Sequence, residues 1–163
     1  MGTEYARRTG FEVVGRDGLT LTDKWRPGVR TLHGLMVAGF PPNLFVESIA
    51  QSGFTVNFPP YLLDVQATHV AWIITQALAR DLTRLETSTA AEDAWVEIVV
   101  GRSAGTADRA RSCTPGYYNR EGQANATTRQ GSFFYGTPHR VRRHPRCLAG
   151  GRHTRRSRHR SRR

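Results

Sequence analysis

Apolar residues recur at helical spacing in one long segment of the chain, from Tyr61 to Leu78. Polar side chains fill the positions between them, as in a helix with one apolar stripe. Pro60 suits the first turn of such a helix, where its missing N–H does no harm. The pattern predicts a long amphipathic helix with one apolar stripe. The stripe consists of Leu63, Val70, Ile74, Ala77 and Leu78.

A second helix is predicted from Thr89 to about Gly101. Thr89-Ala90-Ala91-Glu92 has the spacing of a capping box, in which a hydroxyl and a carboxylate satisfy backbone donors reciprocally. Gly101 is expected to stop this helix. The apolar side chains at helical spacing are Trp95, Ile98 and Val99.

Four shorter segments have the apolar or β-branched character of strands: residues 11–14, 19–21, 31–38 and 43–47. Arg16-Asp17-Gly18 separates the first two and predicts a tight turn, because Asp-Gly readily supplies positive φ. Residues 22–28 predict a loop or a single helical turn with Trp25 as its apolar anchor.

The segment from Gly39 to Asp64 places a turn, an apolar strand, a loop of small residues and the long helix in succession. Folds of the α/β class bind ligands at such junctions, where helix N-termini offer free N–H groups and partial positive charge. The sequence therefore predicts an α/β piece with its ligand site in this loop.

The net charge of +11 is confined to the last 25 residues, 139–163. They hold 11 arginines and no acidic residue, so residues 1–138 retain 24 − 11 = 13 basic residues against 13 acidic ones. One hypothesis makes the tail a disordered arm that grips nucleic-acid phosphates. The other makes it a product of translation in the wrong frame, since one encoding of residues 139–153 gives an acidic amphipathic helix in the next frame.

Other features predict ordinary roles. Cys113 and Cys147 lack metal-ligand spacing and disulfide density, which favours reduced thiols and a cytoplasmic protein. No segment has the length of a membrane span or the apolar core of a secretory signal. His33 and His69 have no carboxylate at ligand spacing, so no metal site is expected, and His69 is interpreted as solvated. Trp25, Trp72 and Trp95 are expected to anchor the core.

Five pieces in order resemble the C-terminal part of the Baeyer–Villiger flavin monooxygenases, especially the branch that oxidises steroid-like and aryl ketones. The resemblance covers about 110 residues and fades near Pro138. The pieces are Thr9-Gly10-Phe11-Glu12, Leu21-Thr22-Asp23-Lys24-Trp25, Gly39-Phe40-Pro41 with Asn43-Leu44-Phe45, residues 51–58 (QSGFTVNF) and residues 113–119 (CTPGYYN).

The resemblance implies an FAD- and NADPH-dependent enzyme that uses O2 to insert oxygen beside a ketone carbonyl. It implies an incomplete Rossmann-like domain of a few strands and two main helices in residues 1–138, followed by the basic tail. No G-x-G-x-x-G motif for a dinucleotide is present. We therefore expect a fragment that is inactive alone, with an upstream polypeptide supplying the dinucleotide sites, no membrane and no specific nucleic-acid partner.

The resemblance also implies site residues. Gln51, Ser52, Gly53 and Thr55 would contact the flavin, and no catalytic or metal-binding residue is assigned. The residues expected to line the substrate are Phe54, Asn57 and Tyr117.

Simpler interpretations stay open for the same positions. Ser52-Gly53 can be an ordinary turn, Asn57 a helix cap, and Tyr117 a side chain packed under the Pro-Gly turn. The sequence also departs from the family at Pro42 and Pro60, where two prolines stand in place of one, and each extra residue can shift the loop.

Overall fold

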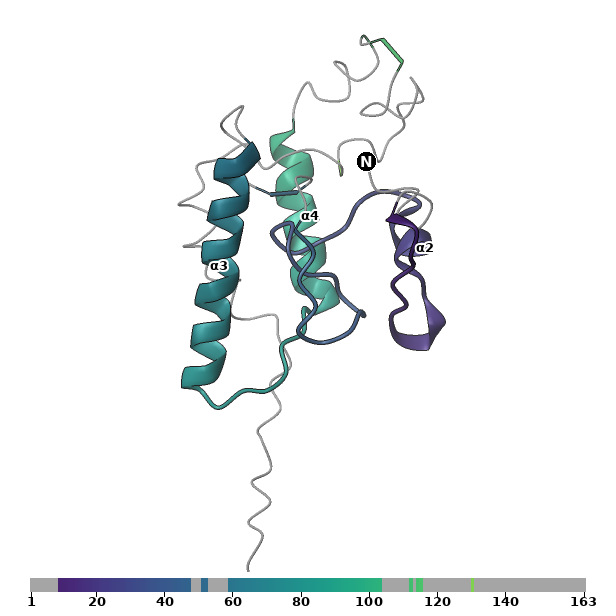
Figure 1. The fold of residues 1–163 in the computed structure, drawn as a ribbon. Coiled ribbons are helices and arrows are strands. Elements are labelled where there is room, and N and C mark those ends of the chain that lie inside the picture. Colours follow the sequence, from purple (N-terminus) through teal and green to yellow (C-terminus); the bar gives the residue numbers. More distant parts are fainter. Residues whose placement is uncertain are drawn as a thin grey trace, which may run out of the picture.

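The computed structural model describes residues 9–47, 51–52 and 59–103, with single positions at 112, 114, 115 and 130. In Figure 1, α3 and α4 run in opposite directions and α2 lies on the other side of the irregular loops. The described part is therefore helical, with long loops packed between the helices. Its elements are the 3-10 turn η1 (Arg16–Gly18), α2 (Leu21–Trp25), α3 (Pro59–Ala79) and α4 (Thr89–Arg102).

The long helix predicted from Tyr61 to Leu78 is confirmed as α3. It ends in a Schellman-type motif, in which Asp81 takes a left-handed conformation (φ 54°). The N–H of Leu82 then donates to the carbonyl of Ala77 at 2.9 Å, which satisfies one of the free carbonyls at the helix end.

Most of the apolar stripe of α3 is not buried against the described core. Only Ala77 of that stripe is buried, whereas Ile74 is 43% exposed and Leu78 is 73% exposed. The face that packs on the described core instead carries Gln66 and His69, because this face meets a histidine and tryptophan cluster of the loops and α4. Hydrophobic periodicity locates an apolar stripe but does not say which neighbour covers it.

Helix α4 begins one residue earlier than a Thr89 cap requires. The side chain of Ser88 is the N-cap and accepts a hydrogen bond from the N–H of Ala91 at 3.2 Å. Glu92 is consequently free of the predicted capping box and turns inward, where it is 1% exposed. Gly101 lies inside the last turn and does not stop the helix, which ends at Arg102.

The four predicted strands are absent from the described residues, where Val14–Thr20 and Leu32–Met36 pair only as isolated antiparallel bridges. The first bridge closes the predicted Asp-Gly turn, with φ of 58° at Asp17. The return strand at 19–21 does not form because the hydroxyl of Thr20 accepts from the N–H of Asp23 and starts α2 there.

Residues 31–38 reverse direction and do not extend. His33 and Gly34 both have positive φ, 57° and 75°, and the N–H of Leu35 donates to the carbonyl of Leu32 at 3.0 Å. Two successive positive φ values are the mark of a type I′ turn. The His-Gly pair therefore folds the predicted strand into a tight turn.

Residues 43–47 bond to two different loops and not to a ladder. Asn43 exchanges hydrogen bonds with Leu85 through both its backbone and its side chain, at 3.0 and 2.9 Å. Val46 donates to the carbonyl of Leu35 at 2.6 Å. A strand needs successive residues to pair with one partner, and the Rossmann-like sheet stays without support in the described part.

Two apolar clusters hold the loops on the helices. The partly buried Val13, Leu44 and Val46 pack against the cluster around α2. The partly buried Ala91 and Ile98 pack against the cluster on α4. The predicted anchors Trp25 and Trp95 are confirmed as buried, while Trp72 is half-buried. The buried members are Leu21, Trp25, Val29, Val37 and Phe40 in the first cluster, and Leu32, Trp95 and Val99 in the second.

The close approach of Gly15 and Gly39 yields a stability prediction. A Cβ on Gly15 would lie 2.6 Å from the carbonyl oxygen of Gly39, whereas a Cβ on Gly101 would meet nothing within 4 Å. We expect Gly15→Ala to lower the free energy of unfolding by about 1–3 kcal/mol. Gly101→Ala should raise it by up to about 1 kcal/mol, because alanine favours the helix. Urea unfolding of the two variants checks this, and equal effects would contradict it.

Candidate functional site

Gln51 stands at the start of the predicted ligand-binding loop and is fully buried. Its backbone is left-handed, with φ of 62°, a conformation that costs a non-glycine residue of the order of 1 kcal/mol. Four hydrogen bonds use its side-chain amide. The oxygen accepts from the N–H and the hydroxyl of Thr31 at 2.7 and 2.8 Å, and the nitrogen donates to the carbonyls of Val29 and Gln130 at 2.5 and 2.9 Å.

The tight turn beside Gln51 is held by the same threonine. The hydroxyl of Thr31 donates to the amide oxygen of Gln51 and also accepts from the N–H of Gly34 at 2.9 Å. Thr31 is completely buried, so each of these polar groups depends on its protein partner. The amide of Gln51 and the His-Gly turn are therefore tied together.

Helix α4 supplies the fourth partner of Gln51. The indole N–H of Trp95 donates to the backbone carbonyl of Gln51 at 2.9 Å. The same indole ring packs edge-on against His33, with 4.4 Å between the ring centroids. A residue of α4 thus holds both the turn and the start of the loop.

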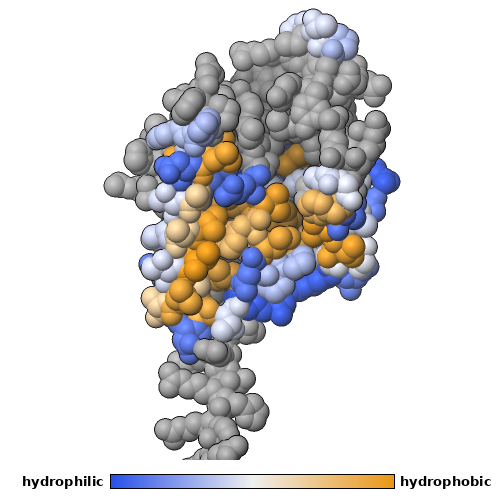
Figure 2. All heavy atoms as spheres, in the orientation of Figure 1, coloured by the Kyte–Doolittle hydropathy of each residue, from blue (hydrophilic) through white to orange (hydrophobic). Residues whose placement is uncertain are grey.

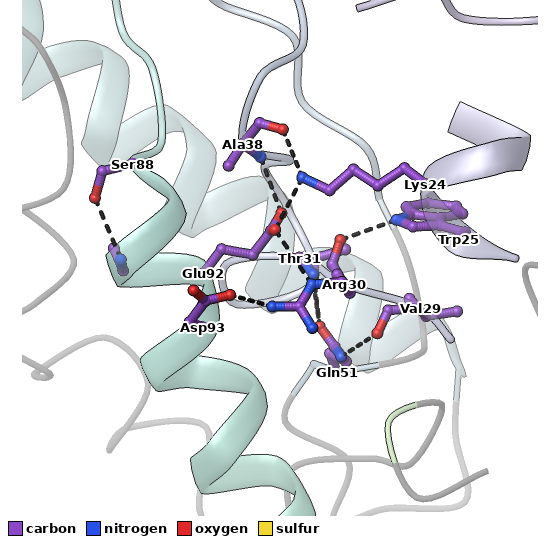
Figure 3. Close-up of polar contacts among 11 residues, drawn as sticks. Lys24, Trp25, Val29, Arg30, Thr31, Ala38, Gln51, Ser88, Glu92 and Asp93 are labelled. Atoms are coloured by element: carbon purple, nitrogen blue, oxygen red, sulfur yellow. Dashed lines mark hydrogen bonds and ion pairs between the residues drawn. The ribbon is translucent and has the colours of Figure 1, made fainter. Parts of the chain in front are cut away.

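Glu92, one helical turn before Trp95, fixes α4 against the opposite side of the molecule. Its two carboxylate oxygens accept from the N–H of Ala38 at 2.9 Å and pair with Lys24 of α2 at 2.9 Å. Lys24 also donates to the carbonyl of Ala38 at 2.5 Å. Arg30 lies 3.7 Å from the same carboxylate and pairs with Asp93. Figure 3 shows these contacts converging between α2, the loops and α4.

Histidine and tryptophan rings line the contact between α3 and the rest. The ring centroids of His33 and His69 are 5.8 Å apart, and those of His69 and Trp72 are 6.2 Å apart. The interpretation of His69 as solvated is wrong, since it is 3% exposed. Among the described residues, no group of three or more His, Cys, Asp or Glu side chains could hold a metal ion.

A second ion cluster consists of Glu86, Arg16 and Arg84. Glu86 accepts from Arg16 and from Arg84, the latter through its Nε at 2.8 Å. Hydrogen bonding to Arg16 first and to Arg84 second lowers the pKa of Glu86 below its ordinary value. Its carboxylate therefore stays charged at neutral pH and ties η1 to the segment that leads into α4.

The structure describes only part of the predicted site. Gln51 and Ser52 are both buried, at 0% and 1% exposure. Neither side chain is therefore exposed at the surface of the described part. The predicted site residues that lie outside the described residues are Gly53, Phe54, Thr55, Asn57 and Tyr117.

Residues 139–163, with both hypotheses for the tail, also lie outside the described residues. So does the predicted domain boundary at residue 138. Within the described ranges, neither α3 nor any other helix combines the length and the apolar character that crossing a membrane requires.

Known relatives decide the family. No protein-family model matches the chain. It is 47% identical over 121 residues to neopentalenolactone D synthase of Streptomyces avermitilis and 39% identical over 126 residues to a Baeyer–Villiger monooxygenase of Stachybotrys chlorohalonatus. These matches cover 74% and 77% of this chain. An FAD-binding monooxygenase of Hypomyces subiculosus is 38% identical over 132 residues, or 81% of the chain.

The chain is a homologue of the Baeyer–Villiger, FAD-binding monooxygenases. It spans about a fifth of their length, since it covers 20%, 22% and 20% of these three relatives. The predicted resemblance is thereby confirmed. None of these relatives supports the alternative of a nucleic-acid-binding protein.

Solved monooxygenase structures match the fold of the chain. A polycyclic ketone monooxygenase from Thermothelomyces thermophila aligns with a TM-score of 0.75 and 32% identity, over 93% of this chain and 25% of its own. A steroid monooxygenase bound to NADP aligns with a TM-score of 0.60 and 25% identity, over 83% of this chain and 24% of its own. The helical part of the chain thus corresponds to a segment of these larger monooxygenases.

Sequence patterns alone missed three important residues. Glu92 was assigned to a cap, Thr31 to a strand and His33 to no site at all. The His-Gly pair was the available signal, because two adjacent residues that tolerate positive φ predict a type I′ turn. No local pattern indicates that Trp95 reaches Gln51, since 44 residues separate them.

Proposed function

We propose that this chain is the flavin-facing C-terminal portion of an FAD- and NADPH-dependent monooxygenase that inserts oxygen next to a ketone carbonyl. The observation that carries the proposal is its 47% identity to neopentalenolactone D synthase across most of this chain. Further support comes from relatives named as FAD-binding and from a solved relative bound to NADP. A cytoplasmic location is part of the same proposal.

The start of α3 suits a group that carries negative charge, such as the reduced flavin, beside the loop. α3 begins at Pro59, directly after the loop, and its first turn carries no acidic residue. Pro59 and Pro60 have no N–H to offer, so such a group would meet the partial positive charge of the helix end with no carboxylate in the first turn. In this proposal Ser52, Gly53 and Thr55 face the flavin. The residues that face the ketone are Phe54, Asn57 and Tyr117.

The chain's own contribution is binding and orientation. FAD and NADPH, when bound, supply the redox chemistry that transfers oxygen from O2. Ser52 and Thr55 offer hydroxyl groups for hydrogen bonds, Gly53 permits a close approach, and Phe54 keeps water away. Gln51 contributes through its position, because its amide already makes four hydrogen bonds within the protein.

A partner polypeptide has to supply the dinucleotide sites, because this sequence contains no G-x-G-x-x-G motif. We assign its docking surface to the α3 outer face, defined as Leu63, Val70, Ile74 and Leu78. Three of these side chains are at least 43% exposed, and Figure 2 shows apolar side chains in a band over this side of the molecule.

Two observations favour the polypeptide with the dinucleotide sites as the partner that covers the α3 outer face. A continuous apolar stripe along a 21-residue helix marks an interaction surface. The matching relatives also carry about four fifths of their length outside the matched segment. The dinucleotide-binding body of a monooxygenase is therefore the partner that fits this face.

A chimera tests the proposed activity. Residues 1–138 replace the matching segment of the polycyclic ketone monooxygenase of Thermothelomyces thermophila. We expect this chimera to bind flavin and to convert a ketone to an ester or lactone with consumption of NADPH. The chain alone should show no NADPH-dependent O2 uptake. A chimera that is loaded with flavin yet forms no oxygenated product from a panel of ketones would refute the proposal, as would O2 uptake by the chain alone.

Replacement of apolar side chains on the α3 outer face by lysine tests the docking surface. The double variant Ile74→Lys, Leu78→Lys should raise the monomeric fraction of the isolated chain, because it removes exposed apolar area. In the chimera it should lower the yield of flavin-loaded protein severalfold, because a buried unpaired charge is costly.

Thr68→Lys is the matched control, since Thr68 is exposed on α3 outside the stripe. Size-exclusion chromatography and flavin absorbance report the two effects. If the double variant and the control gave the same flavin-loaded yield, the α3 outer face would not be the docking surface.

A further inference from the structure

Gln51 combines backbone strain with complete burial, a combination that needs an explanation. Its φ of 62° is unfavourable for a side chain with a Cβ, and its exposure is 0%. Such conformations persist only where the surroundings over-determine them, and they cluster at sites that clamp ligands. A glycine would adopt this backbone without strain. The side chain of Gln51 is therefore the feature to explain.

The contacts of Gln51 join parts of the chain that are distant in sequence. Its amide nitrogen bridges the carbonyls of Val29 and Gln130, which lie 22 residues before it and 79 residues after it. Its amide oxygen accepts both donors of Thr31, and its backbone carbonyl accepts from Trp95 on α4. Five hydrogen bonds from four partners thus meet at one residue, and Figure 3 shows its amide between Val29 and Thr31.

The polarity of an amide matches these partners, whereas a charged side chain of either sign does not. One end of the amide must accept from two donors, and the other must donate to two carbonyls. A carboxylate offers acceptors only, and a lysine offers donors only. The contacts therefore require an amide, held at the reach of a glutamine side chain.

We propose that Gln51 is a positioning residue that fixes where the loop of residues 52–58 starts. We call the five hydrogen bonds of Gln51 the lock. The lock sets the orientation of Ser52, the next residue, and thereby of the groups assigned to the flavin. This inference rests on the proposed function for its purpose. The lock itself is a property of this chain and can be measured without a flavin.

Hydrogen exchange of the full chain tests the lock through two substitutions. Gln51→Ala leaves the donors of Thr31 and the carbonyls of Val29 and Gln130 without this partner. It should raise the exchange of peptides covering residues 52–58 and 29–31 by about tenfold or more, while residues 62–78 of α3 keep their protection.

Gln51→Glu adds a pH readout that a purely space-filling role would not produce. The introduced carboxyl group is buried and faces two carbonyl oxygens, so its pKa should lie above the ordinary value of about 4.3. Ionised, it repels both carbonyls; protonated, it can donate to one of them. The ratio of variant to wild-type exchange in residues 52–58 should therefore be large near about pH 8 and fall toward one near about pH 5.

The control makes the same chemical change elsewhere. Gln76→Glu on α3 converts an amide to a carboxylate at a half-buried position. For this variant, the ratio of variant to wild-type exchange in residues 52–58 should not change with pH. The lock would be overturned by wild-type exchange of residues 52–58 at the rate of an unstructured peptide. A uniform rise over the whole chain in Gln51→Ala, or a flat pH profile in Gln51→Glu, would overturn it as well. A failed chimera would instead remove the proposed function and leave the lock in place.

Discussion

The arrangement of the described residues depends on one buried carboxylate, that of Glu92. It is 1% exposed, and it holds Lys24 of α2, the N–H of Ala38 and the neighbouring Arg30. Taking a carboxylate and an ammonium group out of water is costly, and the cost is offset only where the geometry and the remaining hydrogen bonds are good. Here Lys24 gains a second partner in the carbonyl of Ala38, so both charges are satisfied.

The position of α4 follows from that contact, and the position of the loop follows from α4. Trp95 lies three residues after Glu92 and therefore on the same side of the helix. Its indole N–H holds the carbonyl of Gln51, and its ring holds His33 of the tight turn. The charge cluster is thus linked through α4 to Gln51 and to the tight turn.

The sequence predicts local structure well here and long-range placement poorly. The long helix, the Asp-Gly turn and the anchors Trp25 and Trp95 are all encoded by nearby residues, and the structure confirms them. The strand at 43–47 failed because Asn43 uses its side chain to mimic backbone pairing with Leu85, which apolar patterning cannot register. The neighbours of α3 could not be read from its stripe, because hydrophobic periodicity marks apolar positions and does not say what covers them.

The site divides in the same way. Family motifs point to the segment around Gln51 and Ser52 as a site, which stays a prediction, and no pattern could assign Glu92 to the core 54 residues away from its partner Ala38. A double-mutant cycle on Lys24→Met and Glu92→Gln, followed by urea unfolding, measures the coupling on which this account depends. We predict a coupling free energy of about 2 kcal/mol or more, because either single change leaves a buried group without its charged partner. A coupling below about 0.5 kcal/mol would contradict the account.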